Sequence, residues 1–240
     1  MPSRSVRAYA HRGGTEAAPE NSPAAFAAAV AAGYRYLETD VRSTRDGVAV
    51  IHHDATLERT TDLTGLVRSR SWSEMRCARF ANGESPLRLE DLLEAHPEAY
   101  LNIDVKDRHV VAPALDVLHR MNAWDRVCVT SFSTSRLAAV RRSAPRRLET
   151  AAGPPEVARV RWGLGRLHLP RRLQVPLRLG GRPFVTPGLV RRAHDGGLRV
   201  DVWTVNARTD MEALLDLGVD GIMTDLPSLL REVLSARGLW

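Results

Sequence analysis

Aromatic residues are scarce in this chain, cysteines are few, and lysine occurs once. Phe, Trp and Tyr together make up 5% of the 240 residues, and none of the common nucleic-acid-binding motifs is present. The two cysteines, Cys77 and Cys128, lack the spacing of metal ligands, and we interpret both as reduced thiols. These shortages argue against a nucleic-acid partner and against a fold held together by disulfides or by zinc-bound cysteines.

Long apolar segments are also missing. The longest one, around residues 24–32, is rich in alanine and far too short to span a bilayer. The first 14 residues lack the apolar core of a signal peptide. We therefore expect a cytoplasmic protein without stable membrane insertion. With 44% hydrophobic and 26% charged residues, the chain has the composition of a globular domain with a substantial core.

The charge balance is positive, but the positive residues are dispersed. The formal net charge is +6, and arginine pairs occur at residues 141–142, 146–147, 171–172 and 191–192. Arginines distributed in this way are typical of solvated helix faces, and they would also attract an anionic substrate. A non-enzymatic protein that binds nucleic acid or another anionic surface is the alternative explanation of this charge.

The single lysine, Lys106, is conspicuous in so arginine-rich a chain. Of the 34 basic residues, 34 − 1 = 33 are arginines. Lysine is a compact point charge suited to a phosphate group, and the planar guanidinium of arginine does not simply replace it. Lys106 therefore indicates a phosphate-binding position, with chance retention as the alternative.

Segments with strand character alternate with helical segments along the whole chain. The expected strands are residues 6–10, 35–41, 100–106, 126–131, 147–151, 166–169, 198–205 and 221–224. Eight such units predict an α/β fold, a (β/α)8 TIM barrel, as one domain over residues 1–240 with a short insertion at residues 54–88. Residues 170–187 are expected to form a loop near the ligand. A doubly wound sheet is disfavoured because no GxGxxG turn follows the first strand.

Residues suited to catalysis collect where these strands end. Glu38 and Asp40 point to the same face of the second strand, because side chains alternate along a strand. Two like charges buried side by side repel each other, and a divalent cation would offset that cost. A salt-bridged pair at a solvated strand end is the alternative. The expected strand ends carry His11, Glu38, Asp40, Asp104, Lys106 and Trp203.

Five sequence elements extend this pattern over nearly the whole chain, from residue 10 to residue 227. They are HRGGTEAAPENSPAAF, YLETDVRSTRDGVAVIHHDATLERTTD, LNIDVK, VDVWTVN and GVDGIMTDLP. In order and spacing they resemble the glycerophosphodiester phosphodiesterase family of the phospholipase C-like phosphodiesterase superfamily. The resemblance implies a metal-dependent barrel enzyme that hydrolyses small glycerophosphodiesters to sn-glycerol 3-phosphate and an alcohol such as choline or ethanolamine.

The same resemblance implies a role for each matching catalytic residue. His11 and His53 match the acid–base pair of the family. Glu38 and Asp40 match two of its metal ligands, and Asp104 stands where the third ligand is usually a glutamate. Asp104 is one methylene shorter, so the metal would shift or recruit a further water. Oxygen ligands of this kind favour Mg²⁺, Ca²⁺ or Mn²⁺ over zinc.

Further matching positions are implied to contact the substrate. Arg12 matches a phosphate-contacting arginine, Lys106 a phosphate-neutralising lysine, and Trp203 an aromatic wall beside the glycerol. Glu20 and Asn21 match a motif after the first strand whose role is partly structural.

The two histidines can exchange protons near neutral pH, as general acid–base catalysis requires. Our hypothesis is that His53 deprotonates the attacking hydroxyl and His11 protonates the departing alcohol, although the reverse order fits the sequence equally well. Strand alternation places His52 on the core side instead. His168 is a weaker candidate for the pocket lining, and Asp225 is expected to cap the last helix.

A second enzymatic interpretation keeps the fold and the metal but changes the substrate. The enzyme would then hydrolyse lysophospholipids, with an activity like that of a lysophospholipase D. An exposed apolar rim around the site would favour this alternative.

Overall fold

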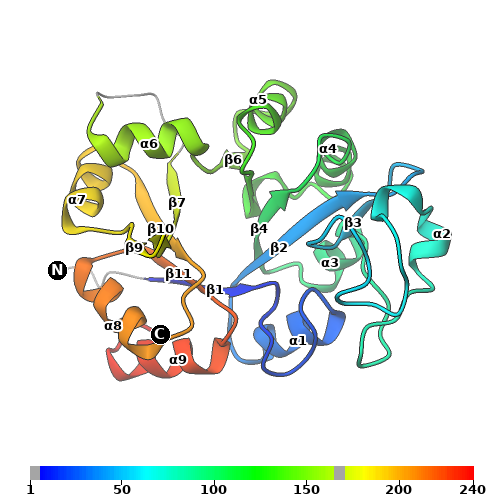
Figure 1. Cartoon of the computed structure of the whole chain (residues 1–240), viewed down its shortest axis with the longest axis horizontal. Coiled ribbons are helices and arrows are strands. Elements are labelled where there is room, and N and C mark those ends of the chain that lie inside the picture. The colour runs from blue at the N-terminus through cyan, green and yellow to red at the C-terminus, as the bar shows by residue number, and fades with distance from the viewer. Residues whose placement is uncertain (1–5, 165–170) are drawn as a thin grey trace.

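The computed structural model describes residues 6–164 and 171–240, in which parallel strands form a nearly closed barrel (Figure 1). The barrel strands are β1 (Arg7–His11), β2 (Tyr36–Ser43), β4 (Tyr100–Val105), β5 (Val127–Thr130), β6 (Glu149–Thr150), β7 (Arg172–Pro176), β10 (Arg199–Trp203) and β11 (Gly221–Thr224). Their order around the sheet is β6-β5-β4-β2-β1-β11-β10-β7. A parallel bridge between Ala151 and Arg172 joins the two ends of this sheet. The expected TIM barrel is confirmed.

One expected loop is wrong. Residues 170–187 contain β7 and a hairpin of β8 (Arg178–Leu179) and β9 (Arg182–Pro183). Leu173 and Val175 are fully buried on one face of β7, which is the alternation of a barrel strand. Prolines on both sides of this short alternation made the segment resemble a loop. The strand expected at residues 166–169 lies outside the described residues.

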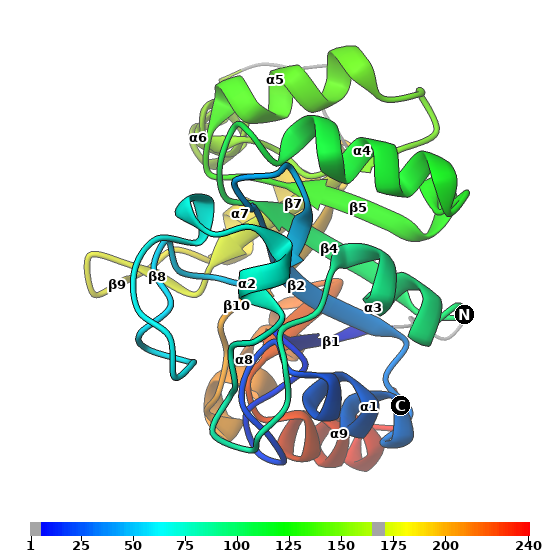
Figure 2. The same cartoon turned by 90° about the vertical axis from the view of Figure 1, so that its right-hand side faces the viewer.

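The helices surround the strands (Figure 2). They are α1 (Pro23–Ala31), α2 (Trp72–Met75), α3 (Leu89–Ala95), α4 (Val111–Arg120), α5 (Thr134–Ser143), α6 (Pro154–Trp162), α7 (Pro187–Asp195), α8 (Arg208–Leu217) and α9 (Pro227–Ala236), with 3-10 turns η1 (Val67–Ser69) and η2 (Trp124–Arg126). Helix α1 begins as its sequence predicts, because the Ser22 side chain accepts a hydrogen bond from the Ala25 N–H over 3.2 Å. Among the described residues, no helix combines the length and the apolar character that crossing a bilayer requires.

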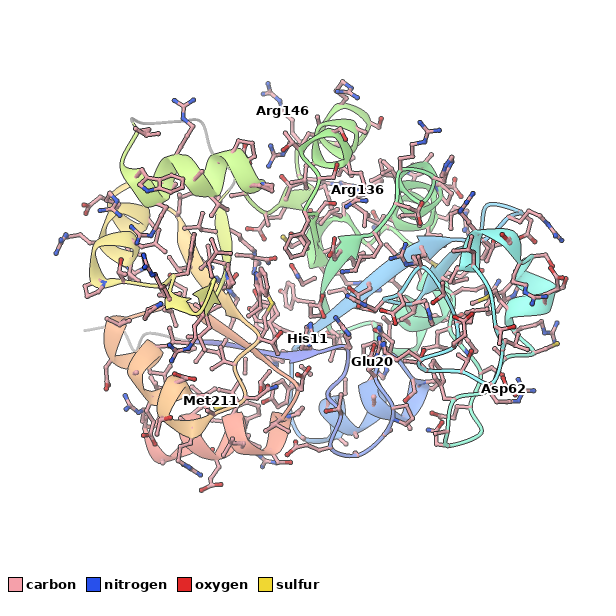
Figure 3. All side chains as sticks on the ribbon, viewed as in Figure 1. His11, Glu20, Asp62, Arg136, Arg146 and Met211 are labelled. Carbon is pink, nitrogen blue, oxygen red and sulfur yellow. The ribbon has the colours of Figure 1, made fainter. Side chains whose placement is uncertain are left out.

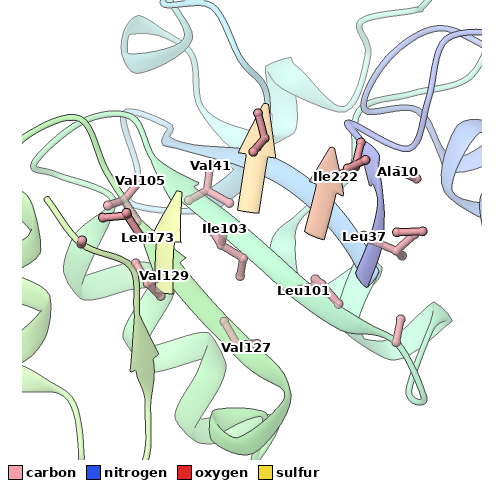
Figure 4. Packing of buried hydrophobic residues seen from close by; sticks show 14 of the residues in the cluster. Ala10, Leu37, Val41, Leu101, Ile103, Val105, Val127, Val129, Leu173 and Ile222 are labelled. Atoms are coloured by element: carbon pink, nitrogen blue, oxygen red, sulfur yellow. The ribbon is translucent and has the colours of Figure 1, made fainter. Parts of the chain in front are cut away.

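Alternation along the strands separates an apolar layer from a polar barrel interior. Apolar strand residues belong to the large buried cluster shown in Figure 4: Leu37, Val41, Leu101, Ile103 and Val105. The residues between them on β2 and β4 line a cavity in the barrel: Glu38, Asp40, Asn102 and Asp104. The period of two thus anchors each strand on one face and presents polar groups on the other.

The segment after β2 forms a small excursion at one end of the barrel. Strand β3 (Ala49–Ile51) pairs antiparallel with β2. Val50, Leu57, Val67 and Met75 then form a buried cluster of their own. Figure 2 shows this segment at the same end of the barrel as the β8–β9 hairpin. The expected insertion at residues 54–88 corresponds to this excursion, and its limits as a domain feature stay a prediction.

Candidate active site

A cavity of about 470 Å³ opens at the end of the barrel where the strands finish. The eight residues predicted to catalyse the reaction, bind the substrate or hold the metal all line it: His11, Arg12, Glu38, Asp40, His53, Asp104, Lys106 and Trp203. Figure 3 shows His11 near the middle of the ring of strands, whereas Arg146 lies at the edge of the molecule. The fold therefore collects these positions in one place, although they come from distant parts of the chain.

A left-handed turn after β1 brings the chain back over β2. Arg12, Gly13 and Gly14 all have positive φ angles, of 53°, 81° and 88°. A Cβ atom on Gly14 would lie 2.5 Å from the Pro227 side chain, so only glycine fits there. The turn also points the Arg12 N–H at Glu38, whose Oε2 accepts a hydrogen bond over 3.1 Å.

Three carboxylates lie side by side below this turn. Glu38 and Asp40 lie on β2, and Asp104 lies on β4 in register with Asp40. Their exposed fractions are 5%, 1% and 3%, so all three are buried. Burial raises the pKa of Glu38 to about 7, and the negative charge of Asp40 acts in the same direction. Burial also raises the pKa of Asp104. The barrel thus holds more negative charge at this point than its surroundings fully stabilise.

Two cationic side chains lie among these carboxylates. Lys106 Nζ is 2.8 Å from Asp40 Oδ1 and 2.7 Å from Asp104 Oδ2. Arg12 Nε is 3.1 Å from Asp40 Oδ2. Although burial opposes it, these two cations hold the pKa of Asp40 below its usual range. The sole lysine of the chain is therefore the residue that bridges two of the acids.

The donor chemistry of this cluster fits a hard divalent cation. Within residues 6–164 and 171–240, no three His, Cys, Asp or Glu side chains are already arranged around a common metal position. Lys106 lies between two of the acids. Asp104 Oδ1 is nevertheless buried and accepts no hydrogen bond from any described group. A buried carboxylate oxygen without a partner is costly, and an oxygen-liganded cation would satisfy it.

Each of the two histidines has a carboxylate partner of its own. His11 Nδ1 donates to Asp225 Oδ1 over 2.6 Å, and His53 Nδ1 donates to Asp54 Oδ1 over the same 2.6 Å. The carboxylate fixes the orientation and the tautomer of the ring. In both cases Nε2 is the nitrogen left for another group, and in His11 it lies 3.7 Å from Glu38 Oε2.

The partner carboxylates were missed in the sequence. Asp225 was expected to cap the last helix, and this is wrong: the residue at the N-cap of α9 is Leu226, without a side-chain cap. Asp225 instead accepts hydrogen bonds from His11 and from Asn206 Nδ2. Its place at the end of β11 is the signal that pointed to the site. Asp54 directly follows His53, but adjacency alone assigns no contact.

Two other histidines had been considered. His52 is buried, and its Nε2 lies 2.9 Å from the Thr56 carbonyl, so its expected packing role is confirmed. His168 lies outside the described residues.

One wall of the cavity is apolar. Its large side chains come from the ends of α6, β8 and β10 and from the residues that follow β5 and β9: Phe132, Trp162, Leu179, Phe184 and Trp203. The Phe132 and Trp203 rings meet edge to face with 5.3 Å between centroids. Phe132, Trp162 and Leu179 are 63%, 68% and 64% exposed, which is unusual for residues of this size. The cavity therefore combines a charged floor with an apolar rim.

Comparisons with known proteins agree with this arrangement. The model of the glycerophosphoryl diester phosphodiesterase family matches residues 11–229. A Mycobacterium tuberculosis protein named probable glycerophosphodiester phosphodiesterase 2 is 43% identical over 245 residues, covering 97% of this chain and 92% of that protein.

Solved structures agree as well. The structure of glycerophosphodiester phosphodiesterase from Agrobacterium tumefaciens has a TM-score of 0.82 at 25% identity, covering 96% of this chain and 99% of that one. An Oleispira antarctica phosphodiesterase, in complex with the product sn-glycerol-3-phosphate, has a TM-score of 0.83 at 22% identity, covering 95% and 96%. At that identity the second structure supports the fold alone.

Proposed function

Since the chain belongs to the glycerophosphoryl diester phosphodiesterase family, we propose that it hydrolyses glycerophosphodiesters to sn-glycerol 3-phosphate and an alcohol, with a divalent cation and two histidines. It is an enzyme of the glycerophosphodiester phosphodiesterase class. The observation that carries the finer proposal is the meeting of three carboxylates, two cationic side chains and two histidines in one cavity. The Mycobacterium tuberculosis relative that is 43% identical, named probable glycerophosphodiester phosphodiesterase 2, supports the same activity here. Membership of this family leaves the non-enzymatic alternative without support.

In the proposed site, Glu38, Asp40 and Asp104 hold the cation. Their hard oxygen atoms suit Mg²⁺, Ca²⁺ or Mn²⁺, and the unpartnered Oδ1 of Asp104 supports a ligand role for the residue that departs from the family pattern. When bound, the cation neutralises phosphoryl oxygens and stabilises the charge that develops during hydrolysis.

Arg12 and Lys106 bind the phosphodiester itself. A phosphodiester is anionic and repels a nucleophile, so neutralisation by fixed positive charges lowers the barrier. Both side chains are already held at the cavity floor by Asp40, which limits the reorganisation that substrate binding requires. Trp203 is proposed to form the wall beside the glycerol, and its contact with Phe132 holds its ring in place.

His11 and His53 exchange protons with the substrate through Nε2, because their Nδ1 atoms are bound to carboxylates. One histidine accepts the proton of the attacking hydroxyl. Attack by water gives sn-glycerol 3-phosphate directly, whereas attack by the glycerol hydroxyl gives a cyclic phosphate that a water molecule then hydrolyses. The other histidine donates a proton to the departing alcohol oxygen. Each proton transfer of this kind contributes a rate factor of about 10²–10⁴.

The proposal is tested with a panel of deacylated phospholipids, assayed for glycerol phosphate release with and without a chelator. His11→Ala and His53→Ala should each lower kcat by about 10² or more. His119→Ala, at an exposed position in the last turn of α4, is the matched control and should keep the wild-type kcat. A folded His11 or His53 variant with normal turnover would contradict the catalytic role of that histidine. Full activity in the presence of chelator would contradict the need for a divalent cation.

Lysophospholipids are a second candidate substrate class. The exposed side chains of Phe132, Trp162 and Leu179 favour them, because a water-soluble glycerophosphodiester has no acyl chain to cover such a rim. Choline release from lysophosphatidylcholine, compared with release from glycerophosphocholine, separates the two classes. Release from the deacylated compound alone would exclude the lysophospholipid reading.

A further inference from the structure

A series of charged contacts joins two of the cavity-lining site residues through three side chains that are not part of the lining. It passes from Arg12 to Glu20, on to Arg59, then to Asp54, and ends at His53. Arg12 and Glu20 belong to the connection between β1 and α1, whereas Arg59 lies in the excursion after β3. The contacts therefore link the β1–α1 connection to the excursion after β3, two segments that lie far apart in the sequence.

Arg59 lies in the middle of this series of contacts. Its Nη1 donates to Glu20 Oε2 over 2.9 Å, and its Nη2 donates to Glu20 Oε1 over 2.7 Å. Its Nε donates to Asp54 Oδ2. A guanidinium presents its N–H groups in a fixed plane, so one side chain orients both carboxylates at once. A lysine ammonium has no such plane.

Each of these carboxylates contacts a proposed site residue as well. Glu20 Oε1 accepts a hydrogen bond from Arg12 Nη1 over 3.0 Å. Asp54 Oδ1 accepts one from His53 Nδ1 over 2.6 Å. Arg59 therefore fixes the two groups that hold a phosphate-binding arginine and a catalytic histidine.

The position of Arg59 is itself well supported. Leu57, two residues earlier, is fully buried in the small cluster of the excursion. The N–H groups of Thr60 and Thr61 donate to the Leu57 carbonyl over 3.3 and 3.0 Å, which closes a turn around Arg59. The side chain of Arg59 is 48% exposed, and an isolated exposed ion pair has little effect on stability. An effect on catalysis would therefore come from the geometry of the site rather than from the stability of the fold.

We propose that Arg59 is a positioning residue, which through Asp54 and Glu20 holds His53 and Arg12 in their working orientations. The inference rests on the proposed function, since it takes the roles of His53 and Arg12 from there. The excursion after β3 would then contribute to catalysis through the Arg59 guanidinium, which links Glu20, the partner of Arg12, to Asp54, the partner of His53.

The first test compares Arg59→Ala, Arg59→Lys and the control Arg45→Ala. Arg45 is an exposed arginine whose Nη2 contacts Glu74 at 3.2 Å, outside the cavity. We expect kcat on glycerophosphocholine to fall by about 10- to 100-fold in Arg59→Ala, as for other residues that orient a functional group. Arg59→Lys should recover only a small part of that loss. Arg45→Ala should keep wild-type kcat, and all three variants should melt near the wild-type temperature. Full rescue by lysine would show that charge alone matters and would overturn the proposal.

The second test is a double-mutant cycle between Arg59→Ala and Asp54→Asn. If Arg59 acts through Asp54, the double variant should lose little more kcat than the more damaged single variant. Losses that multiply would mean that the two residues act independently, and the proposal would be wrong. His53→Ala is measured alongside. A normal rate in that variant would reject the proposed role of His53 in catalysis, whereas a slow His53→Ala with an unimpaired Arg59→Ala would reject only the inference.

Discussion

Among the described residues, two largely buried charged clusters lie at opposite ends of the barrel, and they differ in how their charges are matched. The lower cluster, around the beginning of β1, β7 and β10, contains Arg7 and Arg172 together with Asp201 and Glu149. The upper cluster contains Glu38, Asp40 and Asp104 together with Arg12 and Lys106.

In the lower cluster the charges balance. Arg7 Nη2 lies 2.8 Å from Asp201 Oδ1, and Arg172 Nε lies 2.6 Å from Glu149 Oε2. The Tyr9 hydroxyl donates a further bond to Asp201 Oδ2 over 3.2 Å. Two cations thus face two carboxylates. Although burial acts against it, Asp201 keeps the pKa of Arg7 raised. Such a balanced network fits a structural role.

In the upper cluster the charges do not balance. Three carboxylates face two cations, so when all five groups are ionised 3 − 2 = 1 negative charge is in excess. Burial raises the pKa of Glu38 to about 7, and the negative charge of Asp40 adds to this shift. The formal charges of the lower cluster cancel, although Arg7 Nε and Arg172 Nε have no hydrogen-bond partner among the described residues. The upper cluster has an excess negative charge that a further cation would offset. The difference suggests a simple criterion: an unbalanced buried cluster beside a cavity is the functional one.

The largest effect on this comparison should come from Asp201→Asn. The substitution removes a buried negative charge and leaves Arg7 without its ionic partner, which should lower the free energy of unfolding by about 3–5 kcal/mol. Urea denaturation measures this change. The kcat of the molecules that remain folded should stay at the wild-type value. Asp216→Asn is the matched control, since it breaks an exposed pair with Arg237 and should leave stability unchanged. Wild-type stability of Asp201→Asn would contradict the structural role of the lower cluster.

Asp104→Asn should give the opposite result. It removes the excess charge of the upper cluster, so the free energy of unfolding should stay at or above that of the wild type, while kcat/KM falls by about 10²–10³. Urea denaturation and glycerol phosphate release measure the two quantities, and calorimetric titration with Mg²⁺ should show weaker binding. A strongly destabilised variant would mean that both clusters are structural, and the comparison would fail.

The sequence predicted most of the fold and the upper cluster because both depend on local patterns. Alternation on β2 and β4 is enough to aim Glu38, Asp40 and Asp104 at the same interior. Strand β7 was missed because its few apolar residues lie between prolines, and its pairing with β10 is a long-range contact. The lower cluster was not foreseen for a related reason. Arg7 and Asp201 meet only after the barrel closes, and 194 positions separate them in the chain.

The same limitation explains why the contact between Asp225 and His11 was not predicted. The local pattern assigned Asp225 to a helix cap, but the closed barrel brings it to His11. Among these substitutions, Asp225→Asn is expected to have the smallest effect, and it tests the most specific contact. An amide in place of the carboxylate can still accept a hydrogen bond from His11 Nδ1, but it no longer offsets a positive charge on the ring, so kcat should fall by about 10- to 100-fold.

The chain offers a matched control for this test, because His194 Nε2 lies 2.8 Å from Asp220 Oδ2 in an Asp–His pair that lies outside the cavity. Asp220→Asn changes the same chemistry away from the cavity, so kcat should not change even if stability does, since Asp220 also accepts the Val200 N–H. Equal losses of kcat in both variants would trace the effect to stability. A loss confined to Asp225→Asn would identify the contact between Asp225 and His11 as part of catalysis. The functional part of the molecule would then include this His–Asp pair, which adjoins the upper cluster through His11 and Glu38.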